Sequence, residues 1–306
     1  MAFDLTNPLV IAISSRALFD LEEENRIYEE QGLDAYIAYQ REHEEEILPQ
    51  GPAFSLVKAF LNLNKLDDSH RTVEVIIVSR NNADTSLRIF NSIRHYGLDI
   101  IRAALVGGAE VAPYLKAFRT DLFLSANAPD VKQAIDNGVA AGMILTGRSQ
   151  CSQNQEIDQI RVAFDGDAVL FSAESERVFK QQGLDAFIAH EASHADMPLS
   201  KGPFANFLMT LSRIQNMYRH RERGPIRTAL VTSRSAPAHE RAIRTLRNWD
   251  VRVDEAFFLG GVSKTDILAS FGAHIFFDDQ HVHAAPAASV VPSAVVPYRD
   301  GDDPTR

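Results

Sequence analysis

Short apolar runs alternate with longer amphipathic stretches along the chain, and this alternation predicts strands and helices in turn. The runs at 9–13 (LVIAI) and 161–164 (RVAF) each precede a long stretch with helical periodicity. Further strands are predicted at 73–78, 121–125, 227–231 and 274–278, and one more before each of the glycine pairs at 107–108 and 260–261. Amphipathic helices are predicted at 83–97 and 236–250. Strands that alternate with helices indicate an α/β fold with a largely parallel sheet.

This series of elements occurs twice, because the chain contains an internal repeat. Residues 12–54 align without a gap with residues 163–205, at a constant offset of 151, and 15 of the 43 aligned positions are identical. The match resumes at an offset of 153, where VIIVSR at 75–80 aligns with TALVTS at 228–233. The chain is therefore predicted to hold two copies of one α/β unit.

The repeat divides the chain into two predicted units, residues 1–147 and 158–306. The polar stretch at 146–159 (TGRSQCSQNQEIDQ) is predicted to link them. In each unit a Gly-Pro pair, at 51–52 and at 202–203, is predicted to open the second helix, because proline suits the first helical turn.

Composition and charge narrow the classes of function. Of the 306 residues, 45% are hydrophobic and 24% are charged, which is enough apolar material for a core. The net charge of −10 argues against binding to a nucleic acid polymer. The single cysteine, Cys151, suits a reducing compartment. We see no signal peptide and no apolar run near the ~18 residues of a membrane span, so a cytoplasmic protein is expected. A homo-oligomer is left open.

Four carboxylates follow predicted strands of the second unit. Asp165 and Asp167 end the strand in VAFDGDAVLF (162–171), and Asp278 and Asp279 end the strand at 274–278. Sites in parallel sheets lie at the carboxyl ends of strands, so these groups are expected to converge. Their mutual repulsion calls for a hard divalent cation, and Mg²⁺ prefers carboxylate oxygens.

A hydroxyl and an amine add to this predicted cluster. Thr232 follows the strand at 227–231, and Lys264 begins a helix after a glycine pair. Both can donate hydrogen bonds to a phosphoryl group, while one aspartate is free to attack phosphorus. The residues therefore point to phosphoryl transfer.

The sequence resembles a known family at these positions. DGDAV at 165–169, a threonine after an apolar strand, a later lysine and a terminal Asp-Asp pair are similar to the motifs of haloacid dehalogenase (HAD) phosphatases. Nearly the whole chain resembles their cytosolic type I 5′-nucleotidase branch, on the segments SSRALF (14–19), GPAF (51–54), RVAFDGDAVLFS (161–172), HIFFDDQ (274–280) and VPY (296–298). The resemblance implies two HAD-like, Rossmannoid parallel-sheet units related by duplication, the second of them catalytic.

The resemblance also implies roles for the catalytic residues. Asp165 would be the nucleophile that forms an aspartyl-phosphate. Asp167 would protonate the leaving oxygen and then activate water. Thr232 would hydrogen-bond the transferring group, and Lys264 would neutralise it and orient Asp165.

The implied metal ligands surround the same nucleophile. Mg²⁺ would be held by Asp278, the Asp165 carboxylate and the Asp167 carbonyl. Asp279 would either bind the water shell of the metal or hold Lys264, and the sequence leaves both roles open.

The implied substrate is a nucleoside 5′-monophosphate, with AMP the leading candidate. The residues by themselves indicate only a phosphate monoester, so a HAD phosphatase for other esters such as sugar phosphates remains an alternative. A nucleotide-binding regulator without turnover is the alternative from another class. Phe179, Phe187 and Phe204 are candidates for stacking on a base, although packing in the core is the commoner role for phenylalanine.

The first unit lacks the acidic residues of the second. Ser14 aligns with Asp165 and Arg16 with Asp167, so this unit is predicted to be non-catalytic. One hypothesis is that Ser14, Ser15 and Arg16 hold the phosphate of the substrate or of an effector. The other is that Arg16 has a structural carboxylate partner. In the second unit the corresponding phosphate-contacting candidates are Ser233 and Arg234.

Two histidine patterns are weaker candidates for a metal site than the aspartates are. HEASH at 190–194 fits the zinc peptidase pattern, but a third ligand is missing and the first unit keeps only His43. We expect a half-exposed helix face there. His281 and His283 follow the last predicted strand and alternate, so they are expected to face the same way in a surface loop.

Overall fold

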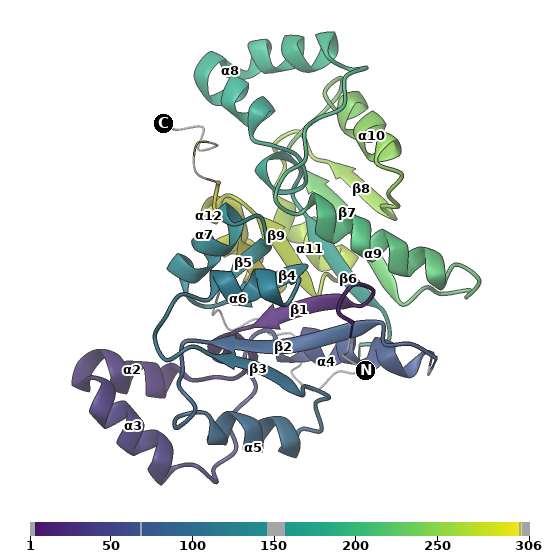
Figure 1. Ribbon diagram of the computed structural model, residues 1–306. Coiled ribbons are helices and arrows are strands. Elements are labelled where there is room, and N and C mark those ends of the chain that lie inside the picture. The colour runs from purple at the N-terminus through teal and green to yellow at the C-terminus, as the bar shows by residue number, and fades with distance from the viewer. Residues whose placement is uncertain (1–3, 68, 146–156, 300, 302–306) are drawn as a thin grey trace.

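The structure is a computed structural model that describes residues 4–67, 69–145, 157–299 and 301 (Figure 1). Its described strands form one sheet in the order β3-β2-β1-β4-β5-β10-β9-β6-β7-β8. The strands are β1 (Leu9–Ile13), β2 (Val73–Ser79), β3 (Arg102–Leu105), β4 (Leu122–Ser125), β5 (Ala140–Ile144), β6 (Ile160–Phe164), β7 (Ile226–Thr232), β8 (Glu255–Phe258), β9 (Ile275–Asp278) and β10 (Ser293–Val295). The predicted α/β class and the largely parallel sheet are confirmed.

From the centre of the sheet outward, the strands of the two halves follow in equivalent order. It runs β5-β4-β1-β2-β3 in one direction and β10-β9-β6-β7-β8 in the other. Every pair within a half is parallel, whereas β5 and β10 pair antiparallel, with Met143 opposite Val295. A Cβ atom on Gly142 of β5 would lie 2.9 Å from the Cβ atom of Ala294 in β10. The glycine therefore permits the close approach of the two halves.

Helices follow the strands of each half at corresponding places. In the first half they are α1 (Ser15–Leu18), α2 (Glu22–Gln31), α3 (Leu33–Glu42), α4 (Phe54–Asn62), η1 (Leu63–Lys65), α5 (Leu87–His95), α6 (Ala112–Ala117) and α7 (Ala128–Asp136). In the second half they are η2 (Gly166–Leu170), α8 (Glu174–Ser193), α9 (Ala205–Met217), α10 (His239–Asn248), α11 (Lys264–Phe271) and α12 (His281–Ala287). Figure 1 shows α2 with α3, and α8, projecting from opposite ends of the molecule.

Both projecting segments turn at a glycine. Gly32, between α2 and α3, and Gly183, inside α8, each have φ of +85°, which glycine adopts without strain. The identical sequence QGLDA at 31–35 and 182–186 therefore makes the same bend in both halves.

The Gly-Pro pairs do not open the helices in the way that the sequence suggested. Helices α4 and α9 begin at Phe54 and Ala205, two residues after each proline. The glycines have a steric role instead. A Cβ atom on Gly51 would lie 2.7 Å from the carbonyl carbon of Phe19, and one on Gly202 would lie 2.3 Å from the carbonyl oxygen of Phe171. Each pair thus lets two backbone segments cross.

One hydrophobic core extends through both halves. It includes the fully buried strand β1 and continues to Phe277 and Val296 in the second half. Helix α4 contacts β2 of its own half and β6 of the other. Of the predicted linker, only residues 157–159 lie within the described part of the chain, where they lead into β6. No helix in the described ranges is long and apolar enough to cross a membrane.

Two strands were not predicted, and they are the two that join the halves. β5 has the sequence AAGMI, and β10 has only three residues, SAV. Small residues and short length give a weak strand signal, since such strands form through pairing with neighbours. The sequence therefore indicated two sheets where the structure has one.

Candidate active site

Three aspartates and a lysine meet at the carboxyl ends of β6 and β9. Asp165, Asp278 and Asp279 are buried, and one ligand oxygen from each lies within 4.8 Å of the others. Because β6 and β9 are adjacent and parallel, the backbone N–H of Asp165 donates to the carbonyl of Phe277 at 2.8 Å. The structure thus brings together carboxylates that lie 113 residues apart in the sequence.

Lys264 lies between two of these carboxylates. Its Nζ is 2.9 Å from Asp165 Oδ1 and 2.7 Å from Asp278 Oδ2. Burial lowers the pKa of Lys264, but the two carboxylates outweigh burial and raise it overall. The amine is therefore held in its charged form. It does not contact Asp279, so the structure gives no support to the role of Asp279 as the partner of Lys264.

The three aspartates have only one nearby cation, Lys264, among the described residues. Burial raises the pKa of Asp165 to about 6, against the opposing effect of Lys264. The pKa of Asp279 is raised well above its usual range by burial, and then by repulsion from Asp165 and Glu176. A further cation at this point would favour the ionised forms.

The donor set fits a hard divalent cation. Asp279 Oδ1 is buried and has no hydrogen-bond partner among the described residues, so it is free to bind a metal or its water. Asp278 Oδ1 accepts from the backbone N–H of Gln280 at 2.8 Å, which fixes the orientation of that carboxylate. All ligands on offer are carboxylate oxygens, as Mg²⁺ prefers.

The turn that follows Asp165 at the end of β6 lies against Thr232. Gly166 begins the short helical turn η2, and a Cβ atom there would lie 3.1 Å from Thr232 Oγ1. Ala168 in the same turn has φ of +60°, in the left-handed region. Thr232, at the end of β7, is buried, and its hydroxyl accepts from the backbone N–H of Arg234 at 3.3 Å. The glycine of the Asp-Gly-Asp motif is thus required by close approach.

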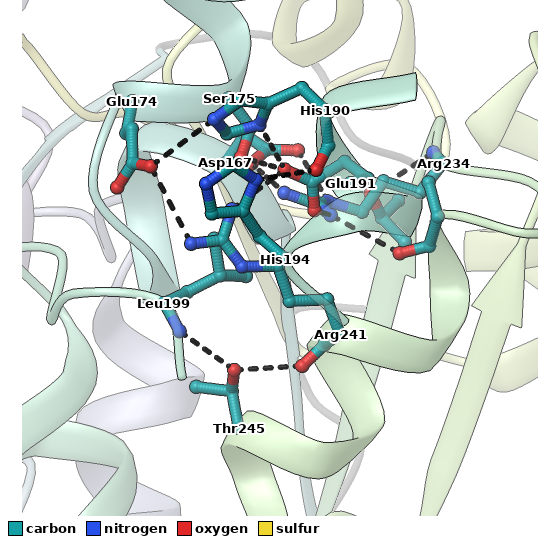
Figure 2. A network of polar contacts seen from close by, with 12 residues as sticks. Asp167, Glu174, Ser175, His190, Glu191, His194, Leu199, Arg234, Arg241 and Thr245 are labelled. Atoms are coloured by element: carbon teal, nitrogen blue, oxygen red, sulfur yellow. Dashed lines mark hydrogen bonds and ion pairs between the residues drawn. The ribbon is translucent and has the colours of Figure 1, made fainter. Parts of the chain in front are cut away.

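Asp167 does not join the acidic cluster and instead pairs with Arg234 (Figure 2). Arg234 donates to Asp167 Oδ1 at 2.7 Å and to Asp167 Oδ2 at 2.9 Å, which makes the pair bidentate. Arg234 is buried, but Asp167 and Glu191 outweigh burial and raise the pKa of its guanidinium. Ser233, the other phosphate candidate on this loop, is exposed.

Glu191, the glutamate of HEASH, anchors this network from α8. It is buried and accepts hydrogen bonds from Arg234, from Arg241 at 2.9 Å and from Ser175 Oγ at 2.7 Å (Figure 2). Burial raises the pKa of Glu191, but Arg234 outweighs burial and lowers it overall. The expectation of a half-exposed helix face is therefore wrong for Glu191, because two buried arginines need a carboxylate.

The histidines near these residues form no zinc site in the described residues, where the acidic cluster is the only group of three or more side chains arranged so that they could hold a metal ion. The rings of His190 and His194 stack with centroids 4.3 Å apart. His281 and His283 lie in the first turn of α12 rather than in a loop. Residues two apart on a helix point in different directions, so the expectation that they face the same way is wrong.

Tyr298 and Glu176 border the site and were missed from the sequence. The Tyr298 hydroxyl donates to Asp279 Oδ2 and lies 3.1 Å from both oxygens of Glu176. Gln280 Nε2 donates to Glu176 at 3.0 Å, and Lys180 Nζ lies 2.8 Å from it. VPY at 296–298 contributed to the family resemblance, but no local pattern places its tyrosine beside a carboxylate 122 residues away.

The three aromatic candidates separate into two environments. Phe204 is fully buried and packs on Phe277 with ring centroids 4.5 Å apart, so it belongs to the core. Phe179 is 47% exposed and meets Phe187 edge to face at 6.2 Å. The Arg234 guanidinium lies 5.5 Å from the centre of the Phe187 ring. Only this second pair borders the site.

The residues aligned with the site in the first half have other contacts. Ser14 Oγ accepts from the backbone N–H of Ala17, and Ser15 Oγ hydrogen-bonds Ser79 Oγ at 3.0 Å. Arg16 donates to Asn25 Oδ1 at 2.7 Å and lies 3.2 Å from Glu22. The carboxylate partner hypothesised for Arg16 is thus present, although Arg16 Nε stays buried without a hydrogen-bond partner among the described residues.

Known proteins are similar to this chain over nearly its whole length. The family model of the 5′-nucleotidases matches residues 1–303. The human protein "Cytosolic 5′-nucleotidase 1B" is 42% identical over 286 residues, which are 90% of this chain and 47% of the human protein. The chain thus spans about half the length of this curated relative. No solved structure matches the chain. The match over nearly all residues confirms the resemblance found in the sequence, and the chain belongs to the 5′-nucleotidase family.

Proposed function

We propose that the chain is a cytoplasmic, Mg²⁺-dependent 5′-nucleotidase that hydrolyses nucleoside 5′-monophosphates, with AMP favoured. The observation that carries the proposal is the buried set of Asp165, Lys264, Asp278 and Asp279 at one edge of the sheet, in a chain of this family. A nucleophile, a fixed cation and a place for a divalent metal are what phosphoryl transfer requires.

In the proposed mechanism Asp165 attacks the phosphorus atom. Its pKa of about 6 leaves the carboxylate mostly ionised at neutral pH. The bond to the 5′ oxygen breaks as the bond to Asp165 forms, and water then cleaves the aspartyl-phosphate. Lys264 and the Thr232 hydroxyl stabilise the charge that develops on the phosphoryl oxygens. Asp165, Asp278 and the Asp167 carbonyl, with Asp279 beside them, would hold Mg²⁺, which would supply positive charge to the phosphoryl oxygens.

Asp167 is proposed as the general acid and then the general base. Both of its oxygens accept hydrogen bonds from Arg234, so neither faces a leaving group in this arrangement. To protonate the leaving oxygen, Asp167 must turn away from Arg234 when substrate binds and take up a proton. Arg234 and the exposed Ser233 are then free to contact the phosphate.

We further propose that the chain arose by duplication of a HAD-like unit, with a non-catalytic copy at 1–147 and a catalytic copy at 158–306. The repeated sequence and the matching strand order of the two halves support this proposal. The shared sheet and core indicate that the two copies fold as one body.

The test is phosphate release by the purified chain with Mg²⁺ and a panel of esters at equal concentration. We expect AMP to be hydrolysed faster than other nucleotides and much faster than sugar phosphates, and EDTA to abolish the activity. A preference for sugar phosphates would replace the nucleotidase by another HAD phosphatase. Absence of turnover with every ester would favour a nucleotide-binding regulator.

A further inference from the structure

The first half contains a cavity of about 370 Å³ at the carboxyl ends of its strands. It is lined by the residues that follow β1, β2, β3 and β4 and by the inner faces of α2 and α3. The corresponding strand ends of the second half carry the acidic cluster. Ligand pockets in α/β proteins occur at such strand ends and have volumes from about 300 Å³ upward.

The acidic groups at this cavity are already neutralised. Glu24 is paired with the buried Arg88 at 2.6 Å. Asp130 is paired with Arg80, which donates to both of its oxygens. Neither carboxylate is therefore a source of uncompensated negative charge.

The remaining charge at the cavity is that of Arg16. Its carboxylate partner Glu22 is 3.2 Å away and has a side chain 57% exposed, so water screens the pair strongly. In contrast with the second half, where three aspartates gather around Lys264, each carboxylate that lines this cavity is paired with an arginine.

Two hydrogen-bond donors at the cavity have no acceptor among the described residues. Arg16 Nε and Asn81 Nδ2 are both buried and unpaired, although both residues line the cavity. A buried donor without a partner costs about 1–3 kcal/mol, which a ligand oxygen would recover. The Ser14 hydroxyl accepts from Ala17, so its own hydrogen remains to be donated. The unmet groups are all donors and include a cation, so an anion is the matching ligand.

An aromatic wall faces the same cavity. Tyr28 and Tyr36 meet edge to face with ring centroids 6.0 Å apart, and both line it. The Tyr36 hydroxyl donates to Asn81 Oδ1 at 3.1 Å, which joins the wall to the unpaired donor. Tyr28 is 51% exposed, so part of its ring is open to a flat ligand. A phosphate ion alone would not use this surface.

We propose that this cavity binds a nucleoside monophosphate without hydrolysing it. The phosphate lies against Arg16, Ser14 and Asn81, and the flat base lies against Tyr28 and Tyr36. Hydrolysis does not occur there, because Ser14 replaces the attacking aspartate and no acidic metal cluster is present among the described residues of this half. This site does not depend on the proposed activity of the second half.

The test is calorimetric titration of the full chain, with Mg²⁺ present, using the non-hydrolysable phosphonate analogue of AMP. We expect two molecules bound per wild-type chain. Arg16→Ala should weaken one of the two sites at least about tenfold, since a charge-assisted hydrogen bond contributes at least 1.4 kcal/mol. The control is Arg26→Ala, which removes an exposed arginine of α2 that pairs with Glu23 and Glu30, and it should keep both sites.

A second variant keeps the test decisive if Arg16→Ala does not fold. Asn81→Asp retains an acceptor for the Tyr36 hydroxyl but places a carboxylate where the phosphate is proposed to lie, so one site should be lost. A wild-type chain that binds one molecule which both variants still bind unchanged, or that binds two molecules with both sites unchanged in both variants, would overturn the proposal. Phosphate release from AMP is measured separately, so failure of the proposed hydrolysis and failure of this second site give different results.

Discussion

The two halves of the molecule share a framework and differ in the chemistry at the ends of their strands. Ser14 and Asp165 directly follow strands β1 and β6, and strands β4 and β9 end at Ser125 and Asp278. The strand order, the glycine bends and the Gly-Pro crossings are the same in both. The framework therefore positions side chains without deciding what they do, because the same strand ends carry aspartates in one half and serines in the other.

Each half also buries an arginine at the same place, but the glutamate that pairs with it comes from a different position. Arg88 on α5 and Arg241 on α10 are both buried, and each needs a carboxylate. Glu24 on α2 serves the first arginine, whereas Glu191 near the end of α8 serves the second. Glu191 lies further along its helical segment than Glu24 does, so it also reaches Arg234, the partner of Asp167. The second half thus connects a structural ion pair to Asp167, the proposed general acid.

The largest effect is expected when the proposed nucleophile is removed. Asp165→Asn keeps the size of the side chain but loses the attacking oxygen anion, and no other group nearby can replace it. Phosphate release should fall by at least about four orders of magnitude while the fold survives. Ser14→Ala is the matched change in the first half and should leave the chemical step intact. Turnover by Asp165→Asn at a rate near that of wild type would show that the halves have been assigned wrongly.

The next effect concerns the metal. Asp278→Ala removes an expected ligand, so the Mg²⁺ concentration for half-maximal activity should rise about a hundredfold or more. Mg²⁺ should also raise the melting temperature of the wild-type chain, because it relieves repulsion among buried carboxylates, and this rise should vanish in the variant. The same melting curve with and without Mg²⁺ in both chains would argue against a metal at this cluster.

The third effect concerns the anchor of Asp167. Glu191→Gln leaves two buried arginines without their carboxylate and should lower the free energy of unfolding by about 3–5 kcal/mol. Urea unfolding measures this loss. Glu174→Gln, at a side chain 42% exposed, is the matched control and should cost less than about 1 kcal/mol. Equal losses in the two variants would mean that the network is not the structural support described here.

These long-range pairs mark the limit of what the sequence predicted. The acidic cluster was predictable because each member follows an apolar strand within a short motif, and parallel strands bring such ends together. Glu191 and Arg234 lie 43 residues apart, and no local pattern couples them. The same holds for Tyr298. Strands β5 and β10 escaped prediction for a related reason, since their small residues become strands only when the two halves pair.

A smaller effect is expected from Tyr298. Tyr298→Phe removes the hydrogen bond to Asp279 without changing the shape of the ring, so Asp279 should be less well oriented. Activity should fall about tenfold at low Mg²⁺ and recover in part at high Mg²⁺. Activity that is independent of this hydroxyl at every Mg²⁺ concentration would exclude Tyr298 as a positioning residue.

The smallest effect is expected at two equivalent side chains, one in each half, that accept a hydrogen bond from a backbone N–H group. Asp121 accepts the backbone N–H of Val10, and His274 accepts that of Arg161 at 2.9 Å. Burial lowers the pKa of His274 from 6.5 to about 4, so the unfolded chain binds this proton more readily. The stability that His274 contributes is full above pH 6.5 and is lost as the pH falls toward 4.

The corresponding variant is His274→Asn, which keeps an acceptor but does not titrate. Between pH 7 and pH 5 the wild-type chain should lose about 1–2 kcal/mol more than the variant, since the ring is partly exposed and its shift is screened. Urea unfolding at the two pH values measures the difference. A loss of the same size in both chains would assign the pH dependence to other groups.

The central claim is that one half reacts and the other does not. The most direct test is to mix the chain with AMP and Mg²⁺, stop the reaction rapidly, reduce it with borohydride and sequence the peptides by mass spectrometry. An aspartyl-phosphate is reduced to homoserine, so homoserine should appear at position 165 and at no position of the first half. Homoserine at another aspartate, or phosphate retained on Ser14, would contradict the account.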